Sequence, residues 1–244
     1  MLKISNIYKT FSGNCSPVLN GVSLELVSGD FCVLIGSNGS GKSTLLKSID
    51  AEYKLDKGKI VTDSNALIAS VSQDINKGTI AEMTLLENMV LSGLLGKKAS
   101  FTFYQKKIEE IKLLIQELGM GLEAYIDKPL NILSGGQRQM IATLMAISSK
   151  PDILLLDEHT SALDPKTQDL LMKYTANAIN ENNITSIMIT HKLNDALCYG
   201  NRLIMLHQGQ IVFDVKNKEK EALTIDDLLS LFHQYEDLIL RNDV

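Results

Sequence analysis

The chain has 244 residues, 45% of them hydrophobic and only 4 of them proline, so it predicts one compact domain with a smaller lobe and excludes collagen-like and largely disordered classes. A net charge of −5 and a pI near 5.4 argue against a large basic surface, so nucleic acid is not an expected partner. The start of the sequence lacks a secretory signal, and no apolar run approaches the roughly 18 residues of a membrane helix. The three cysteines, Cys15, Cys32 and Cys198, include no CxxC pair for zinc binding or redox chemistry.

The beginning of the chain alternates apolar and polar residues, which predicts short strands of a half-buried sheet. Its apolar positions are Leu2, Ile4 and Ile7, followed by Val18, Val22, Leu24 and Leu26. Gly29 and Asp30 interrupt this pattern. The continuous apolar run Phe31–Ile35 then predicts a strand at the centre of a sheet that is covered on both faces.

A glycine-rich segment follows this strand and leads into a predicted helix, Lys42–Ile49. It matches the phosphate-loop pattern of glycine, four residues, glycine, lysine and serine, and the flanking strand and helix disfavour the alternative of a simple capping turn. Such a loop surrounds phosphate oxygens with amides, so we expect ATP, with Lys42 on the β- and γ-phosphates, Ser43 on Mg²⁺ and Thr44 near the α-phosphate. The expected nucleotide-binding residues here are Gly36, Ser37, Asn38, Gly39, Ser40, Gly41, Lys42, Ser43 and Thr44.

Two further short strands are expected near residues 58–61 and 67–72, before the pattern changes to a helical period. This period extends from about Ile75 to Ser149 and predicts a helical insert. Its apolar positions are Leu85, Leu86, Met89 and Val90, and then Ile108, Ile111, Leu114, Ile115 and Leu118. A second buried strand at residues 153–156 returns the chain to the sheet.

An acidic pair, Asp157 and Glu158, follows this second buried strand. Ligands bind in α/β sheets beyond the carboxyl ends of the strands, which is where this pair is expected. We expect Asp157 to hold Mg²⁺ and Glu158 to accept a proton from the attacking water as general base. An acidic pair alone is more often a helix cap or a solvated turn, so the catalytic interpretation of this pair depends on the upstream phosphate loop.

The rest of the chain continues to alternate strands with helices, which predicts an α/β fold with a mainly parallel sheet. We expect a helix after Pro165, a strand at residues 185–190 and a last pair of strands at residues 202–206 and 211–213. Residues 224–240 predict an amphipathic tail helix. The favoured interpretation is that this helix packs on its own domain, and the alternative is that it pairs and regulates two copies of the chain.

A short segment before a predicted apolar helix reads Leu133-Ser134-Gly135-Gly136-Gln137, and here the chain resembles the ATP-binding-cassette (ABC) ATPases, whose signature is LSGGQ. The chain also has Gln73, Ser-Ala-Leu-Asp at residues 161–164 and His191 in the order expected for this family. The resemblance therefore covers residues 1–215. It implies a P-loop NTPase with a mainly parallel core sheet, an N-terminal antiparallel β subdomain and an inserted α-helical subdomain. We therefore divide the single ABC ATPase domain, 1–244, into a nucleotide-binding core at 1–74 and 151–215, a helical subdomain at 75–150 and a helical tail at 216–244.

The resemblance implies roles for single residues. Gln73 is expected to bind Mg²⁺ and sense the transport partner, His191 to contact the γ-phosphate and order the catalytic water, and Asp164 to lie at the seam between two copies. Phe11 falls where the family places an aromatic ring against adenine; core packing is its alternative role, and Tyr8 is the weaker candidate. The signature binds the γ-phosphate of the opposite copy through a positive helix end, so the residues expected to act in trans are Ser134, Gly135, Gly136 and Gln137.

One position departs from the family pattern. His159 follows the glutamate of the acidic pair, where family members usually carry proline. Magnesium prefers oxygen ligands, so we do not expect His159 to bind it, and we assign it no catalytic role. The substitution is expected to change the geometry or the polarity of the turn.

The resemblance implies a soluble, magnesium-dependent ATPase that closes on ATP as a face-to-face homodimer and opens after hydrolysis. Family members without a membrane span usually dock on separate permease subunits, so we expect a cytoplasmic protein, peripheral on the cytosolic face of the cell membrane, with the helical insert as coupling surface. Import is preferred over export, and an importer commonly has a solute-binding protein as a further partner. The alternative is a soluble ABC ATPase of an iron–sulfur cluster assembly complex, which would not fractionate with membranes.

Overall fold

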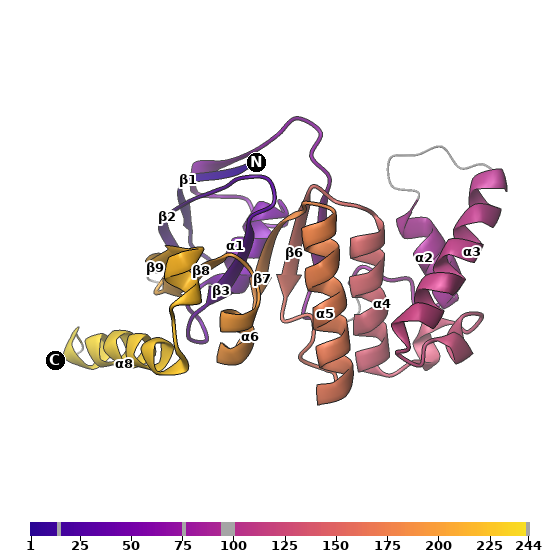
Figure 1. The fold of residues 1–244 in the computed structure, drawn as a ribbon. Helices are drawn as coiled ribbons and strands as arrows, with labels where there is room; N and C mark the ends of the chain where they lie inside the picture. The colour runs from indigo at the N-terminus through magenta and orange to yellow at the C-terminus, as the bar shows by residue number, and fades with distance from the viewer. Residues whose placement is uncertain (14–15, 75–76, 94–100, 243–244) are drawn as a thin grey trace. The chain divides into compact units, whose positions relative to one another are not determined.

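The computed structural model describes residues 1–13, 16–74, 77–93 and 101–242 (Figure 1). The chain forms two compact units, one from Met1–Ala66 with Asn183–Val244 and the other from Leu67–Asn182. Cys15, the predicted subdomain boundary at residue 75 and the last two residues of the predicted tail lie outside the described residues. Within the described ranges, no helix has both the length and the apolar composition that a bilayer crossing requires.

The first unit contains an antiparallel sheet with the order β2-β1-β4. Its strands are β1 Leu2–Lys9, β2 Leu19–Leu26 and β4 Lys57–Thr62. Leu2 lies opposite Leu26 and Ile4 opposite Leu24, and all four side chains are buried, so the alternating apolar residues of the two strands share one face. The predicted N-terminal antiparallel β subdomain is confirmed.

Four strands of the same unit are neighbours in the order β7-β3-β8-β9. They are β3 Phe31–Ile35, β7 Thr185–Ile189, β8 Arg202–His207 and β9 Gln210–Lys216. Strand β3 pairs in parallel with β7 and with β8, whereas β9 runs antiparallel to β8. Every residue of β3, β7 and β8 is buried, as expected for parallel strands that are covered on both faces.

The helices of the first unit are α1 Lys42–Ile49, α6 Leu193–Cys198, α7 Lys218–Glu221 and α8 Ile225–Asn242. Helix α8 begins after Thr224, whose hydroxyl accepts a hydrogen bond from the Asp227 amide at 3.2 Å. Leu228 of this helix is fully buried, and the Tyr235 hydroxyl donates to the Val212 carbonyl at 3.2 Å. The tail helix therefore packs on its own unit.

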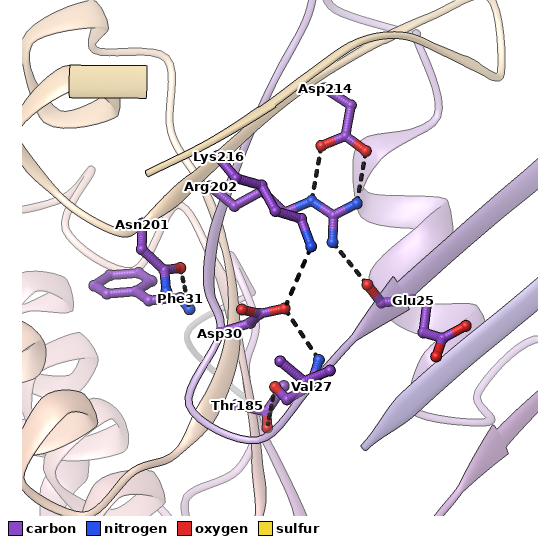
Figure 2. Close-up of polar contacts among 9 residues, drawn as sticks. All are labelled: Glu25, Val27, Asp30, Phe31, Thr185, Asn201, Arg202, Asp214 and Lys216. Atoms are coloured by element: carbon purple, nitrogen blue, oxygen red, sulfur yellow. Dashed lines mark hydrogen bonds and ion pairs between the residues drawn. The ribbon is translucent and has the colours of Figure 1, made fainter. Parts of the chain in front are cut away.

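An ion pair between the buried Arg202 and the exposed Asp214 connects the antiparallel sheet with β8 and β9 (Figure 2). Arg202, which is 6% exposed, donates to both carboxylate oxygens of Asp214, at 2.7 and 2.6 Å. A third nitrogen of its guanidinium donates to the Glu25 carbonyl on β2 at 2.7 Å. Lys216 lies 4.0 Å from the Asp30 carboxylate in the same cluster. A bidentate pair with an additional carbonyl acceptor uses the planar donor geometry of arginine, so it fixes the relative position of three strands.

The second unit combines two parallel strands with a group of helices. The strands are β5 Ile68–Val71 and β6 Ile153–Asp157, and the helices are α2 Leu85–Ser92, α3 Phe101–Leu118, α4 Gly135–Ser148 and α5 Pro165–Glu181. Two short 3₁₀ helices, Glu123–Tyr125 and Leu130–Ile132, connect α3 with α4. Figure 1 shows α4 and α5 side by side.

One apolar core holds these helices together. It includes the buried side chains Leu85, Met89, Ile115, Ile141 and Leu144, each at most 1% exposed. These residues come from α2, α3 and α4, so each helix directs its apolar stripe into a shared interior. The predicted inserted α-helical subdomain is thereby confirmed as part of the fold, while its exact functional limits stay a prediction.

Candidate functional site

Backbone crowding explains Gly36 and Gly41 in the segment between β3 and α1. Gly36 has a φ of +147°, and a side chain on it would meet the Leu206 carbonyl at 2.2 Å. Gly41 has a φ of +105°, and a side chain there would meet the Val18 carbonyl at 2.6 Å. Gly41 is also the residue that precedes α1, so no side chain caps the first turn of this helix. The segment therefore directs backbone N–H groups and a helix N-terminus toward one place, which suits an anion.

Lys42 lies within this loop. Its side chain is 6% exposed, and the ammonium donates to the carbonyls of Gly36 at 2.8 Å and Ser37 at 2.9 Å. The Ser40 hydroxyl is buried nearby and has no hydrogen-bond partner in the described part of the chain. A positive charge and an unused hydroxyl in one glycine-rich loop are the groups that a polyphosphate would satisfy. The predicted ATP site thus fits the geometry of the loop.

Phe11 is half-buried and has an aromatic neighbour. The ring of Tyr53 meets it edge-on, with 5.1 Å between centroids and an interplanar angle of 80°. The Lys9 ammonium lies 5.2 Å from the centre of the Phe11 ring, and the Lys47 ammonium lies 5.7 Å from that of Tyr53. Tyr53 was not predicted from the sequence, although an aromatic residue shortly after α1 is a signal that could have found it. Tyr8 lies elsewhere, beside Lys57.

His191 and the glycine-rich loop follow neighbouring parallel strands. Leu34 of β3 is paired with Ile189 of β7, and the loop begins at Gly36 while His191 comes two residues after β7. Parallel strands place their carboxyl ends at the same edge of a sheet. The first unit therefore brings exposed His191 to the edge from which the loop emerges.

The second unit contains an equivalent edge. Strands β5 and β6 are parallel, with Val71 opposite Leu156, so Gln73 and the acidic pair leave the sheet on the same side. The Gln73 amide donates to the Glu158 carboxylate at 3.4 Å. Asp157 is only 5% exposed, whereas Glu158 is half-buried. Glu158 has a φ of +50°, a conformation that is uncommon for a residue other than glycine and that occurs often at functional sites.

The LSGGQ segment forms the start of α4. The Ser134 hydroxyl accepts from the Gln137 amide at 3.2 Å, and the Gln137 side chain accepts from the Ser134 amide at 3.0 Å, which makes a capping box. Gly135 and Gly136 form the first turn. A side chain on Gly136 would lie 2.8 Å from the Ala162 carbonyl, so glycine allows α4 to approach the segment after Glu158. The helix start keeps its positive end and a serine hydroxyl that can still donate.

Two buried glutamines hold the segment between β6 and α5, and the sequence did not predict them. The Gln139 side chain contacts the Glu158 carbonyl and the Ala162 amide, and the Gln168 side chain donates to the carbonyl and hydroxyl of Thr160. A buried glutamine on an otherwise apolar helix face is the signal that could have found them. Asp164 caps α5 by accepting from the Thr167 amide at 3.2 Å. Hydrogen bonds from Thr167 also lower the pKa of Asp164.

His159 is 2% exposed, and its Nε2 has no hydrogen-bond partner within the described residues. Burial lowers the pKa of this imidazole to about 4, so it is neutral near pH 7. In the described residues there is also no group of three or more His, Cys, Asp or Glu side chains that could hold a metal by themselves. The predicted magnesium ligands, Ser43, Gln73 and Asp157, offer oxygens, which is the donor chemistry that Mg²⁺ prefers when phosphates complete its shell.

Comparisons with known proteins agree with this arrangement. Residues 19–161 match the sequence profile of the family described as ABC transporter. The chain is 40% identical to a tyrosine transport ATP-binding protein of Clostridioides difficile (95% of this chain, 98% of the relative) and 32% identical to the phosphonates import ATP-binding protein PhnC 2 of Oceanobacillus iheyensis (88% and 89%). Among solved structures, it is similar to the dimeric post-hydrolysis state of the ATP-binding cassette MJ0796 bound to ADP and Pi, with 29% identity, a TM-score of 0.77 and coverage of 88% and 98%.

Proposed function

The chain belongs to the ABC transporter family, and from that premise we propose that it is the ATP-hydrolysing subunit that powers import of a solute through separate permease subunits. The observation that carries this proposal is the phosphate loop, in which loop carbonyls hold the buried Lys42 ammonium beside the uncapped start of α1. Relatives named as import ATP-binding proteins support the direction of transport. The adenine ring stacks on Phe11, and Tyr53 packs against the Phe11 ring in a T-shaped arrangement.

The hydrolytic step uses a general base. Glu158 takes a proton from the attacking water, which His191 orders against the γ-phosphate. Gln73 lies within 3.4 Å of the base and holds its carboxylate near the end of β5. Mg²⁺, when bound, supplies positive charge against the phosphate oxygens, and the oxygens of Ser43, Gln73 and Asp157 would hold it.

The working form is a homodimer in which each ATP lies between the phosphate loop of one copy and the LSGGQ segment of the other. The start of α4 supports this role, because its Ser134 hydroxyl and the N–H groups of its first turn form a positive helix end. Asp164 lies in this interface, next to the turn that α4 approaches through Gly136. The dimeric state of a similar cassette with ADP and Pi also supports this arrangement.

A groove on the second unit suits the permease. It has a volume of about 320 Å³ and is formed by β5, residues 78–80, α2 and α4. Ile80 and Leu91 line it and are 46% and 39% exposed. Asn88, fully buried below, accepts from the Ile80 amide at 2.8 Å and donates to its carbonyl at 3.0 Å, so this wall is fixed. The occupant is an amphipathic helix of a permease, whose apolar face would cover these side chains.

A pair of charge substitutions tests this docking site. Leu91→Glu places a charge inside the groove, whereas Leu113→Glu places the same charge on α3, at a side chain that is 57% exposed and does not line the groove. We expect Leu91→Glu to release the protein from membranes while ATP hydrolysis by the isolated subunit stays unchanged, and Leu113→Glu to change neither. Equal membrane association of both variants would reject the groove as the docking site.

Purification of the tagged protein from native membranes tests the function itself. We expect permease subunits to co-purify because the protein docks on them, and a solute-binding protein to co-purify through its contact with the permease. Recovery from the soluble fraction with iron–sulfur assembly proteins would instead favour the alternative class. Those partners select the solute, because relatives of this chain are named for solutes as different as tyrosine and phosphonates.

A further inference from the structure

One side chain connects the LSGGQ helix with the backbone of the general base. Gln139 of α4 is 2% exposed, and its amide makes two hydrogen bonds to the segment after β6. The nitrogen donates to the Glu158 carbonyl at 3.2 Å, and the oxygen accepts from the Ala162 amide at 3.1 Å. A single side-chain amide therefore holds both ends of the segment from residue 158 to residue 162, and both of its hydrogen-bonding groups are used.

The held segment is the one whose conformation decides where the carboxylate of Glu158 lies. Glu158 has a φ of +50°, a strained conformation for a non-glycine residue that persists only when the surroundings enforce it. The Ser161 amide donates to the same Glu158 carbonyl at 3.0 Å, so Gln139 acts on a tight turn. Loss of the contact from Gln139 would let this peptide relax and turn the side chain away from its place beside Gln73.

Gln139 lies one helical turn after the first glycine of the LSGGQ segment, on the same helix. Gly136 brings that turn close to the Ala162 carbonyl. A helix moves as a rigid element, so a displacement of its N-terminus is passed to the residue one turn later. The start of α4 and the peptide of Glu158 are therefore linked through one helical turn and one side-chain amide.

We propose that Gln139 is a positioning residue that couples engagement of the LSGGQ segment by the partner's ATP to the alignment of Glu158 for hydrolysis of the protomer's own ATP. This inference rests on the proposed function, in which the segment acts in trans. Gln139 touches no reacting atom in this scheme. It aligns the general base once closure of the dimer has fixed α4, so that both sites of the dimer hydrolyse ATP only in the closed state.

The test replaces Gln139 by Met, which keeps the length and volume of the side chain but removes both hydrogen bonds. Thr143→Val at a buried position of the same helix is the matched control, because the Thr143 hydroxyl donates to a carbonyl of its own helix, that of Gln139, at 2.9 Å. We expect Gln139→Met to lower kcat for ATP by about 10- to 100-fold, as a displaced catalytic group does, with KM for ATP unchanged within about twofold. Thr143→Val is expected to stay within about twofold of the wild-type kcat.

Formation of the ATP-dependent dimer is the measurement that distinguishes a positioning role of Gln139 from a folding defect. Combined with Glu158→Gln, the Gln139→Met variant is expected to form the ATP-dependent dimer as well as Glu158→Gln alone. A kcat near wild type, or loss of the ATP-dependent dimer together with a raised KM, would overturn the coupling role. If Gln139→Met does not fold, Gln139→Glu, which can accept from Ala162 but not donate to Glu158, is measured in its place with the same expectation. Absence of ATP hydrolysis and of an ATP-dependent dimer in the parent proteins would instead contradict the proposed function.

Discussion

Lys42 shows how a single side chain is prepared for its ligand. Its ammonium is held by the carbonyls of Gly36 and Ser37 at 2.8 and 2.9 Å, in a loop where Gly36 and Gly41 have no room for a side chain. ATP can therefore meet an ordered positive charge, and little rotamer entropy remains to be lost on binding. Because these contacts depend on the Lys42 ammonium, we expect substitution of this residue to weaken ATP binding.

We predict that Lys42→Ala weakens ATP binding by at least about tenfold, because charge-assisted hydrogen bonds to phosphate contribute about 1.5–3 kcal/mol. Isothermal titration calorimetry with ATP measures the change. Lys59→Ala, on an exposed position of β4, serves as control and should bind ATP like the wild type. An unchanged affinity of Lys42→Ala would show that the loop is not the phosphate site.

His159 predicts a pH dependence of stability. Burial lowers its pKa from 6.5 to about 4 in the folded protein, so between these values the unfolded chain binds more protons than the folded one. The free energy of unfolding therefore falls as the pH decreases through this window. The expected loss between pH 7 and pH 5 is about 2 kcal/mol.

Urea unfolding at pH 7 and pH 5, without nucleotide or metal, measures this loss. His159→Gln removes the titrating group and should show a pH dependence that is smaller by about 2 kcal/mol. The same pH dependence in both proteins would mean that the imidazole takes up its proton while folded.

At this scale the place of the acidic pair after a buried strand predicted Glu158, and the family resemblance predicted Gln73. Gln73 and Glu158 were expected at strand ends, and parallel pairing of β5 and β6 brings them within 3.4 Å. Tyr53 and Gln139 were not predicted, because their contacts arise from packing between segments far apart in the chain. A polar residue on an apolar helix face can be noticed in a sequence, but the distant loop that it contacts leaves no periodic trace there.

At the scale of elements, the pair of Arg202 and Asp214 links β8 to β9, and the bond to the Glu25 carbonyl extends this link to β2 (Figure 2). We predict that Asp214→Ala lowers the free energy of unfolding by about 2–4 kcal/mol, because it leaves a largely buried guanidinium without its anion. Lys3→Ala, which breaks an exposed pair with Glu25 at 2.9 Å, should cost at most about 1 kcal/mol. Urea unfolding compares the two variants, and equal small losses would show that the pair of Arg202 and Asp214 does not stabilise the unit.

The elements with strong hydrophobic patterns were predictable. The run Phe31–Ile35 is strand β3 within the same bounds, and the strand expected at residues 67–72 is observed as Ile68–Val71. Helices α6 and α7 were not predicted, since they have six and four residues and are too short to show a helical period. Polar segments between strands do not reveal whether they form one helical turn or a loop.

At the scale of the whole molecule, alternating strands and helices predicted an α/β fold, and the family resemblance predicted the antiparallel subdomain and the helical insert. The face-to-face dimer could not be predicted from sequence patterns in the same way. Contacts with a second copy depend on surface residues that follow no period, so composition and spacing contain no direct signal for them. The LSGGQ segment is the exception, because it gives a phosphate-binding helix end in addition to the phosphate loop.

The central claim is that two copies close around ATP. The most direct measurement is the molecular mass of Glu158→Gln, by size-exclusion chromatography with light scattering, with ATP and Mg²⁺ and with ADP and Mg²⁺. Removal of the base leaves the phosphate contacts intact, so we predict a stable dimer with ATP and a monomer with ADP, and a weakened dimer when Ser134→Ala is added. A Glu158→Gln protein that remains monomeric while ATP is bound to it would contradict the account.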